Sequence, residues 1–165
     1  MDPLPLLDNY LAALAPMVGA ERIELDEDGL CQFQHQSGFT VTLIWQGDAV
    51  NAFTLSSDVL QVPSPDQRAS LYSRLLRLNF LLIETAGSTL AVDEDERYVF
   101  LCRELSLNGL DEMQFLERVA GFMIQAAEIR AELGGGDALG SDGDTARPPD
   151  SGGGFNRFSN NVIRS

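Results

Sequence analysis

The chain contains no lysine, one histidine, two cysteines and one tryptophan among its 165 residues. All eleven of its basic residues are therefore arginine, and 25 acidic residues outnumber them to give a net charge of −14. So negative a surface repels phosphate backbones and anionic lipid headgroups. The charge therefore argues against nucleic acid and against a membrane as partners.

Few residues of the chain could hold a metal ion or act as a catalytic base. A structural zinc site needs four cysteine or histidine ligands, and Cys31, Cys102 and His35 are only three. The acidic run 24–29 resembles the opening of a calcium loop, but His35 occupies the position of the required glutamate. A phosphate-binding P-loop needs a lysine. We therefore expect no metal, no cofactor and no enzymatic activity.

Long apolar runs and a leader-like amino terminus are also missing. The uncharged stretch 9–20 is shorter than the roughly 20 residues that a membrane-spanning helix needs. The opening Met-Asp-Pro has no positively charged flank of a signal peptide. Cys31 and Cys102 are too far apart and too few for a disulfide framework. We therefore expect a cytoplasmic protein with free thiols.

The composition changes abruptly at Gly134. Residues 1–133 hold 21 acidic residues and eight arginines, a net charge of −13, and they show regular apolar spacing. Residues 134–165 hold eight of the fifteen glycines and no apolar periodicity. A segment of that composition cannot bury enough surface to offset its ordering entropy. We predict one folded domain over 1–133 and a disordered Gly/Ser/Asp-rich tail over 134–165.

Within the domain, apolar residues recur at helical spacing in some stretches and at alternate positions in others. Helical spacing predicts helices over 3–16, 65–84 and 110–133. Alternation between polar turns predicts strands, over 21–25, 30–35, 39–45, 49–55, 89–93 and 98–105. We therefore predict an α+β fold, an antiparallel twisted sheet flanked by three helices. The order is helix, three or four strands, helix, two strands, helix.

Two apolar stripes run along the predicted central helix. One contains Leu71, Leu75, Leu78 and Leu82, and the other contains Tyr72, Leu76, Phe80 and Ile83. A helix packed on one sheet needs a single stripe. Burial inside one domain would explain both stripes, but in so short a chain a homodimer interface explains them better. We predict an interface made of the second stripe and the following hairpin: Tyr72, Leu76, Phe80, Ile83, Leu90, Val92, Tyr98 and Phe100.

Four groups of residues follow one another in an order that resembles a known family. They are Gly19, Leu25, Asp26, Gly29 and Cys31; Leu75, Leu76 and Asn79; Gly87, Leu90, Asp93 and Leu101; and Leu116, Phe122, Ala127 and Leu133. Over 1–133 this set resembles the class I effector chaperones of bacterial type III secretion systems. The correspondence covers an Asp-x-x-Gly turn, a Leu-Leu-x-x-Asn central helix, a hairpin and a closing amphipathic helix. The tail from 134 and the lack of lysine depart from the family's pattern.

The resemblance implies an ATP-independent, homodimeric protein of the bacterial cytoplasm. It would bind the unfolded N-terminal segment of a secreted effector in extended form, by strand pairing at sheet edges and by apolar patches. The secretion ATPase or its sorting platform would be a further partner. The resemblance places the patches on the first helix and outer strands, where the candidates are Leu7, Leu11, Leu14, Phe33, Phe39, Val41 and Leu43.

Two other functions remain open from the sequence. A protein of the same fold could sequester a secretion or transcription regulator instead of an effector. An enzyme could work with Asp, Glu and Arg side chains alone. The identity of a co-purified protein distinguishes a regulator-binding protein from an effector chaperone. A metal or small ligand bound to the purified protein would favour an enzyme.

Overall fold

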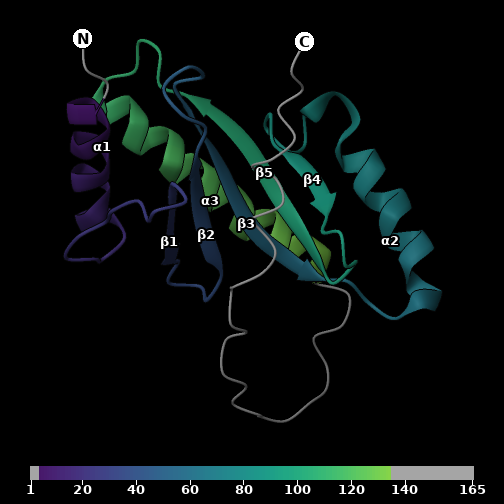
Figure 1. Cartoon of the computed structure of the whole chain (residues 1–165). Helices are drawn as coiled ribbons and strands as arrows, with labels where there is room; N and C mark the ends of the chain where they lie inside the picture. Colours follow the sequence, from purple (N-terminus) through teal and green to yellow (C-terminus); the bar gives the residue numbers. More distant parts are fainter. Residues whose placement is uncertain (1–3, 135–165) are drawn as a thin grey trace.

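The computed structural model describes residues 4–134, and the predicted tail lies outside them except for Gly134. The elements follow the predicted order of helix, three strands, helix, two strands, helix, which confirms the α+β fold (Figure 1). They are α1 (Leu4–Met17), β1 (Leu30–Gln34), β2 (Thr40–Trp45), β3 (Ala52–Gln61), α2 (Pro65–Leu78), the short 3-10 helix η1 (Phe80–Leu82), β4 (Thr89–Val92), β5 (Tyr98–Ser106) and α3 (Glu112–Gly134).

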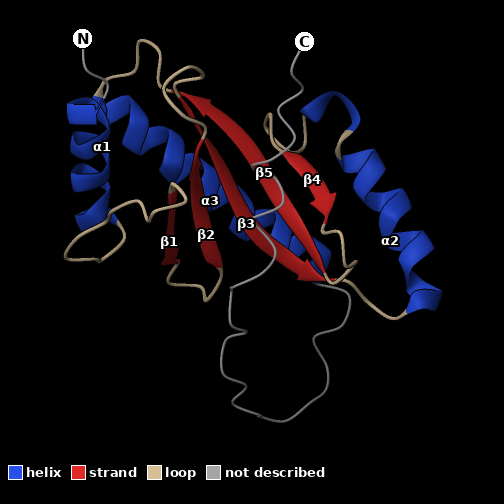
Figure 2. Cartoon of the chain, in the orientation of Figure 1, coloured by secondary structure: helices blue, strands red, loops and turns tan. Residues whose placement is uncertain are grey.

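The five strands form one antiparallel sheet in the order β1-β2-β3-β5-β4 (Figure 2). The long strand β3 lies at the centre and pairs with β2 on one side and β5 on the other. A register shift between Asp58 and Leu60 interrupts its pairing with β5. Strands β1 and β4 are the two edges, and within residues 4–134 each pairs with a single neighbour.

One face of the sheet is packed against α3 and α1. Phe115, Val119 and Phe122 of α3 are fully buried. The Tyr10 ring of α1 lies 4.8 Å from the Phe115 ring, and its hydroxyl donates a 2.7 Å hydrogen bond to the Leu110 carbonyl. α1 and α3 therefore form one connected layer, in which α3 crosses behind the strands (Figure 1). α2 lies outside the β4 edge.

The structure differs from the sequence prediction in two local details. The segment 21–25 is extended but belongs to no strand, so three strands rather than four precede α2. The central helix ends at Leu78 instead of continuing to 84. It ends there because Asn79 turns its side chain to the backbone of Leu90, accepting from the Leu90 N–H at 2.8 Å and donating to the Leu90 carbonyl at 2.9 Å.

Candidate functional site

All seven residues expected to form the apolar patch lie in the core of the chain. Leu14, Val41 and Leu43 have 0% exposed surface, and the others are also buried: Leu7, Leu11, Phe33 and Phe39. They are buried because α3 packs on this part of the molecule together with α1, so that the helices and the sheet share one core. Within residues 4–134 these seven side chains therefore form no exposed apolar patch. Their part in binding a partner remains a prediction.

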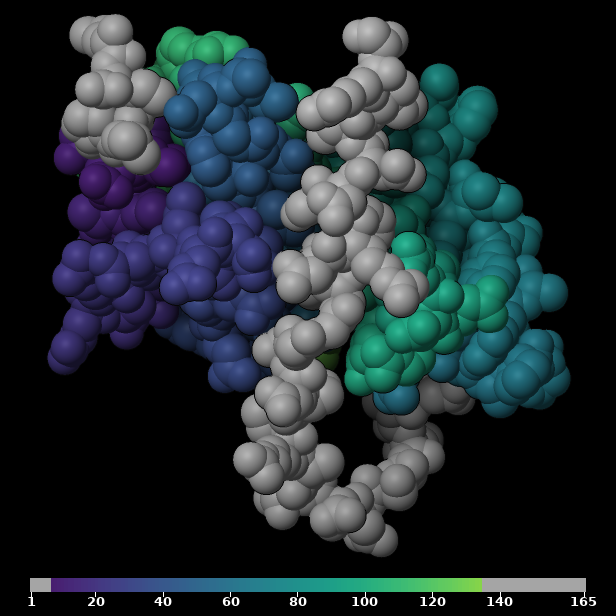
Figure 3. All heavy atoms as spheres, viewed as in Figure 1, coloured from purple at the N-terminus to yellow at the C-terminus, as the bar shows by residue number. Residues whose placement is uncertain are grey.

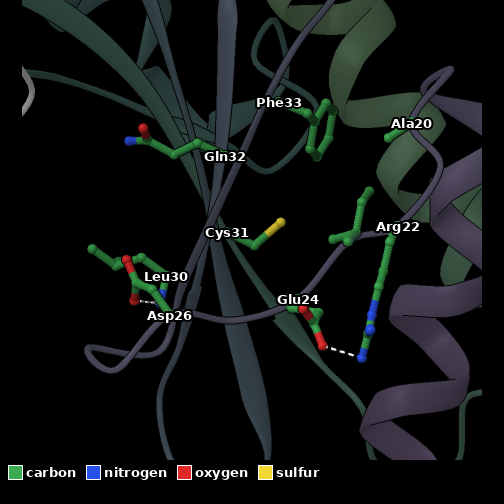
Figure 4. Close-up of a pocket in the computed structure, with 9 residues that line it drawn as sticks. Ala20, Arg22, Glu24, Asp26, Leu30, Cys31, Gln32 and Phe33 are labelled. Carbon is green, nitrogen blue, oxygen red and sulfur yellow. Dashed lines mark hydrogen bonds and ion pairs between the residues drawn. The ribbon is translucent and has the colours of Figure 1, made fainter.

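Two hollows flank the extended segment 20–26, one on each side. The first, of about 400 Å³, lies between this segment and β1. Figure 4 shows Cys31 and Phe33 pointing into this hollow while Gln32 points to the opposite side of β1. The second, of about 530 Å³, lies between the segment and α1, where it borders on Leu7 and Leu11. Three of the seven candidates therefore line a hollow that is open to solvent.

Acidic side chains border both hollows. Asp26 lines the first and Asp8 the second, while Glu24 lines both and forms an ion pair with Arg22. Asp26 also accepts the Leu30 N–H at 2.8 Å, which fixes the start of β1. Beyond that point, strand pairing occupies only one side of β1 in the part of the chain described. An unpaired strand edge of this kind can accept an added strand.

A second surface lies at the end of α2 and just beyond it, where five apolar side chains are exposed. We name it the α2-end patch: Leu76, Phe80, Leu81, Leu82 and Ile83. Leu76, Phe80, Leu81 and Ile83 are 72%, 71%, 70% and 73% exposed. Monomeric proteins rarely leave so many adjacent apolar side chains in water. In Figure 3 the α2 region (teal) and α1 (purple) form opposite sides of the molecule.

The other five residues of the predicted interface differ in how deeply they are buried. Tyr72, Val92, Tyr98 and Phe100 are partly buried, and the Tyr98 and Phe100 rings are 6.5 Å apart. The Tyr72 hydroxyl is buried without a hydrogen-bond partner within residues 4–134. Leu90 belongs to the core. Their part in an interface remains a prediction.

The sequence did not point to Leu81 and placed Leu82 on the first stripe, because the helix was expected to continue through both residues. Their backbone leaves the helical region, with φ of 56° and 54°. Bulky residues seldom adopt such values. The pair Ala86-Gly87, both at positive φ, lies close behind. The glycine was the available signal that the helix ends before this point.

The environments of Cys31 and His35, the residues considered above for metal binding or catalysis, suit a structural role. Burial, and next the Asp26 charge, raise the pKa of the Cys31 thiol to about 11, so the thiol is protonated at neutral pH. His35 stacks on Phe39 at 4.5 Å, and its Nδ1 accepts the Ser37 N–H. In the described range, no cluster of three or more metal-ligating side chains occurs. Nor does any helix within that range have the length and apolar character needed to cross a membrane.

Several solved structures share the fold of this chain. It is 20% identical to a chain of the ExsC–ExsE complex, with a TM-score of 0.63, covering 79% of this chain and 92% of that one. A chain of the ExoU–SpcU complex from the type III secretion system of Pseudomonas aeruginosa is 19% identical, with a TM-score of 0.57, covering 77% of this chain and 93% of that one. A chain of the HopA1–SchA chaperone–effector complex is 20% identical, with a TM-score of 0.55, covering 77% and 91%. No curated protein sequence matches this chain.

A sequence family also matches most of the chain. The match runs over residues 9–130, from α1 to near the end of α3. It includes the first hollow, the α2-end patch and all of the second hollow except Leu7 and Asp8. The protein belongs to the Tir chaperone protein (CesT) family.

Proposed function

We propose that this protein is a type III secretion chaperone for an effector. It binds the N-terminal chaperone-binding segment of the effector in extended, non-globular form and keeps it stable and competent for secretion. The family match over residues 9–130 carries the proposal. The similarity of the fold to a chain from a chaperone–effector complex supports it. The chaperone works in the bacterial cytoplasm and delivers its cargo to the secretion ATPase or sorting platform.

The cargo segment adds a strand to the free edge of β1 and places apolar side chains in the two hollows. Backbone hydrogen bonds at a sheet edge provide affinity, and pockets for alternate side chains provide specificity. Leu7, Leu11 and Phe33 line these hollows, so they would contact the cargo directly. Leu14, Phe39, Val41 and Leu43 belong to the core and line neither hollow, so they would support the surface without contacting the cargo. The acidic border formed by Asp8 and Glu24 favours a cargo segment with basic residues.

The protein works as a homodimer, in which the α2-end patch of each subunit packs on its partner. An isologous interface buries the same patch on both subunits. A stable interface of standard size covers about 800 Å² on each partner. The half-buried side chains of Tyr72, Val92, Tyr98 and Phe100 would extend the contact beyond the patch. The Tyr72 hydroxyl would find a hydrogen-bond partner there.

Affinity purification of the tagged protein from its native host, followed by mapping of the bound protein, tests the proposed function. We expect a secreted effector whose N-terminal segment alone is sufficient for binding. Glu24→Arg, at the border of both hollows, should weaken capture of that segment. Glu27→Arg is the matched control, because Glu27 is exposed and lines neither hollow. Capture of a transcription or secretion regulator instead would favour the sequestering function, and retention of a small ligand or metal would favour an enzyme.

A further inference from the structure

The backbone that carries the α2-end patch has an unusual conformation. Leu81, Leu82, Ala86 and Gly87 all have positive φ, at 56°, 54°, 44° and 86°. Three of these four residues carry side chains that disfavour such values. A backbone of this kind persists only where the surrounding structure holds it. What holds it therefore decides how the patch is presented.

The Arg103 side chain of β5 donates hydrogen bonds to this turn. Its Nε donates to the Ser88 hydroxyl at 2.9 Å, and its Nη2 donates to the Ala86 carbonyl at 2.9 Å. The same Nη2 donates to Gln125 Oε1 of α3. The Ser88 hydroxyl donates to that same oxygen at 3.0 Å. One guanidinium thereby joins β5, the turn and α3.

The surroundings of Arg103 suit a fixed hydrogen-bonding group rather than a surface charge. Its three acceptors are neutral, and its guanidinium lies 5.8 Å from the centre of the Phe122 ring. Burial, and next the charge of Arg118, lower the pKa of Arg103. Arg retains its charge even so, and its planar fork can hold several acceptors in a set geometry. Ser88 and Gln125 are themselves buried.

We propose that Arg103 is a positioning residue for the subunit interface. By fixing the turn over 81–88, it holds Phe80, Leu81 and Ile83 in the arrangement that a second copy of the chain packs against. This role rests on the proposed homodimer, and it explains what holds the interface residues in place. A half-buried arginine that donates a hydrogen bond to a backbone carbonyl of the turn would hold the patch in this arrangement before it is covered.

The test measures the dissociation constant of the full-length dimer by dilution in sedimentation experiments. Arg103→Gln should raise this dissociation constant at least about tenfold, because the turn loses its hydrogen bonds to the guanidinium. The far-ultraviolet circular dichroism should stay unchanged, because the backbone hydrogen bonds between the strands remain. Arg118→Gln is the matched control for charge, since Arg118 is exposed on α3. It should change the constant by less than about twofold. Ser88→Ala removes one acceptor and should act in the same direction, several-fold more weakly.

Amide hydrogen exchange adds a measurement that does not depend on association. At concentrations where the chain is monomeric, Arg103→Gln should speed exchange of the Gly87 and Ser88 amides, which bond to the Leu82 and Thr85 carbonyls. An Arg103→Gln dimer as tight as the wild type, with unchanged exchange, overturns the positioning role and leaves the homodimer intact. A wild type that stays monomeric overturns the homodimer and this inference with it. If Arg103→Gln does not fold, an unchanged Ser88→Ala dimer overturns the inference.

Discussion

The apolar side chains of α1 and those at the end of α2 are alike in type but lie in opposite environments. Leu7, Leu11 and Leu14 are buried against the sheet and α3, whereas Leu76 and Phe80 are exposed. The difference arises from what lies next to each element. α1 packs on α3 and contributes to the core that α3 forms with the sheet, whereas α2 packs on the edge strand β4. Apolar residues of the first region therefore stabilise the fold, and those of the second are available to a partner.

The largest effect should come from removing a side chain of the first region. Leu14→Ala leaves a cavity where no surface is exposed, so we expect a loss of about 2–5 kcal/mol in the free energy of unfolding. Leu76→Ala is the matched control, because a 72% exposed side chain contributes little to the folding of one subunit. Denaturant unfolding of the monomeric chain at low concentration measures both. Equal losses for the two variants would remove the distinction between the regions.

A charge placed in the second region should separate the subunits without unfolding them. Leu76→Asp would put an unpaired carboxylate in the proposed interface, and we expect dimerisation to weaken by about 2–4 kcal/mol. Met113→Asp is the control, since Met113 is 65% exposed on α3, outside the patch. Light scattering over a dilution series compares them. A Leu76→Asp protein that remains a tight dimer would show that the patch is not the interface.

The link between α2 and the sheet edge can be weakened at a single residue. Asn79→Ala leaves the backbone N–H and carbonyl of Leu90 without the partners that end α2. We expect a loss of about 1–3 kcal/mol in the free energy of unfolding. The exchange of the Leu90 amide should also become faster. Asn79→Asp tests the two bonds separately, since a carboxylate can accept the N–H but cannot donate to the carbonyl.

The smallest effect concerns the access of water to Cys31, between β1 and the segment 20–26. Burial raises the pKa of the Cys31 thiol from 9.0 to about 11, so the folded chain holds a proton that the unfolded chain releases at lower pH. The contribution of Cys31 to stability is therefore complete below pH 9 and declines as the pH rises toward 11. We expect a loss of about 1–2 kcal/mol over this range. The loss should be smaller in Cys31→Ala, and an identical pH dependence in the two proteins would mean that water reaches the thiol.

The order of the elements could be predicted because it depends on local spacing and turns. Alternating residues in 39–45 and the leucines of 65–78 report their own secondary structure directly. The end of α2 could not be predicted in this way. Asn79 bonds to Leu90, eleven residues later, so the helix ends through a tertiary contact that the spacing of the leucines does not reveal.

The sites were harder to predict than the fold, because burial depends on which elements cover which face. The alternation of Phe39, Val41 and Leu43 shows that they share a face, but only the placement of α3 shows that this face is closed. Arg103 gave no signal, since an arginine in a strand usually points to water. Its role depends on Ser88 and Gln125, which the fold brings to it from other elements.

The central claim is that cargo and the second subunit use different regions of the chain. Hydrogen exchange of the full-length protein, measured with and without the N-terminal segment of its co-purified effector, tests it most directly. We predict that the cargo adds protection in β1 and in residues 20–26, while residues 76–83 exchange as slowly as in the free dimer. Protection gained in residues 76–83, together with separation of the subunits on cargo binding, would contradict the account.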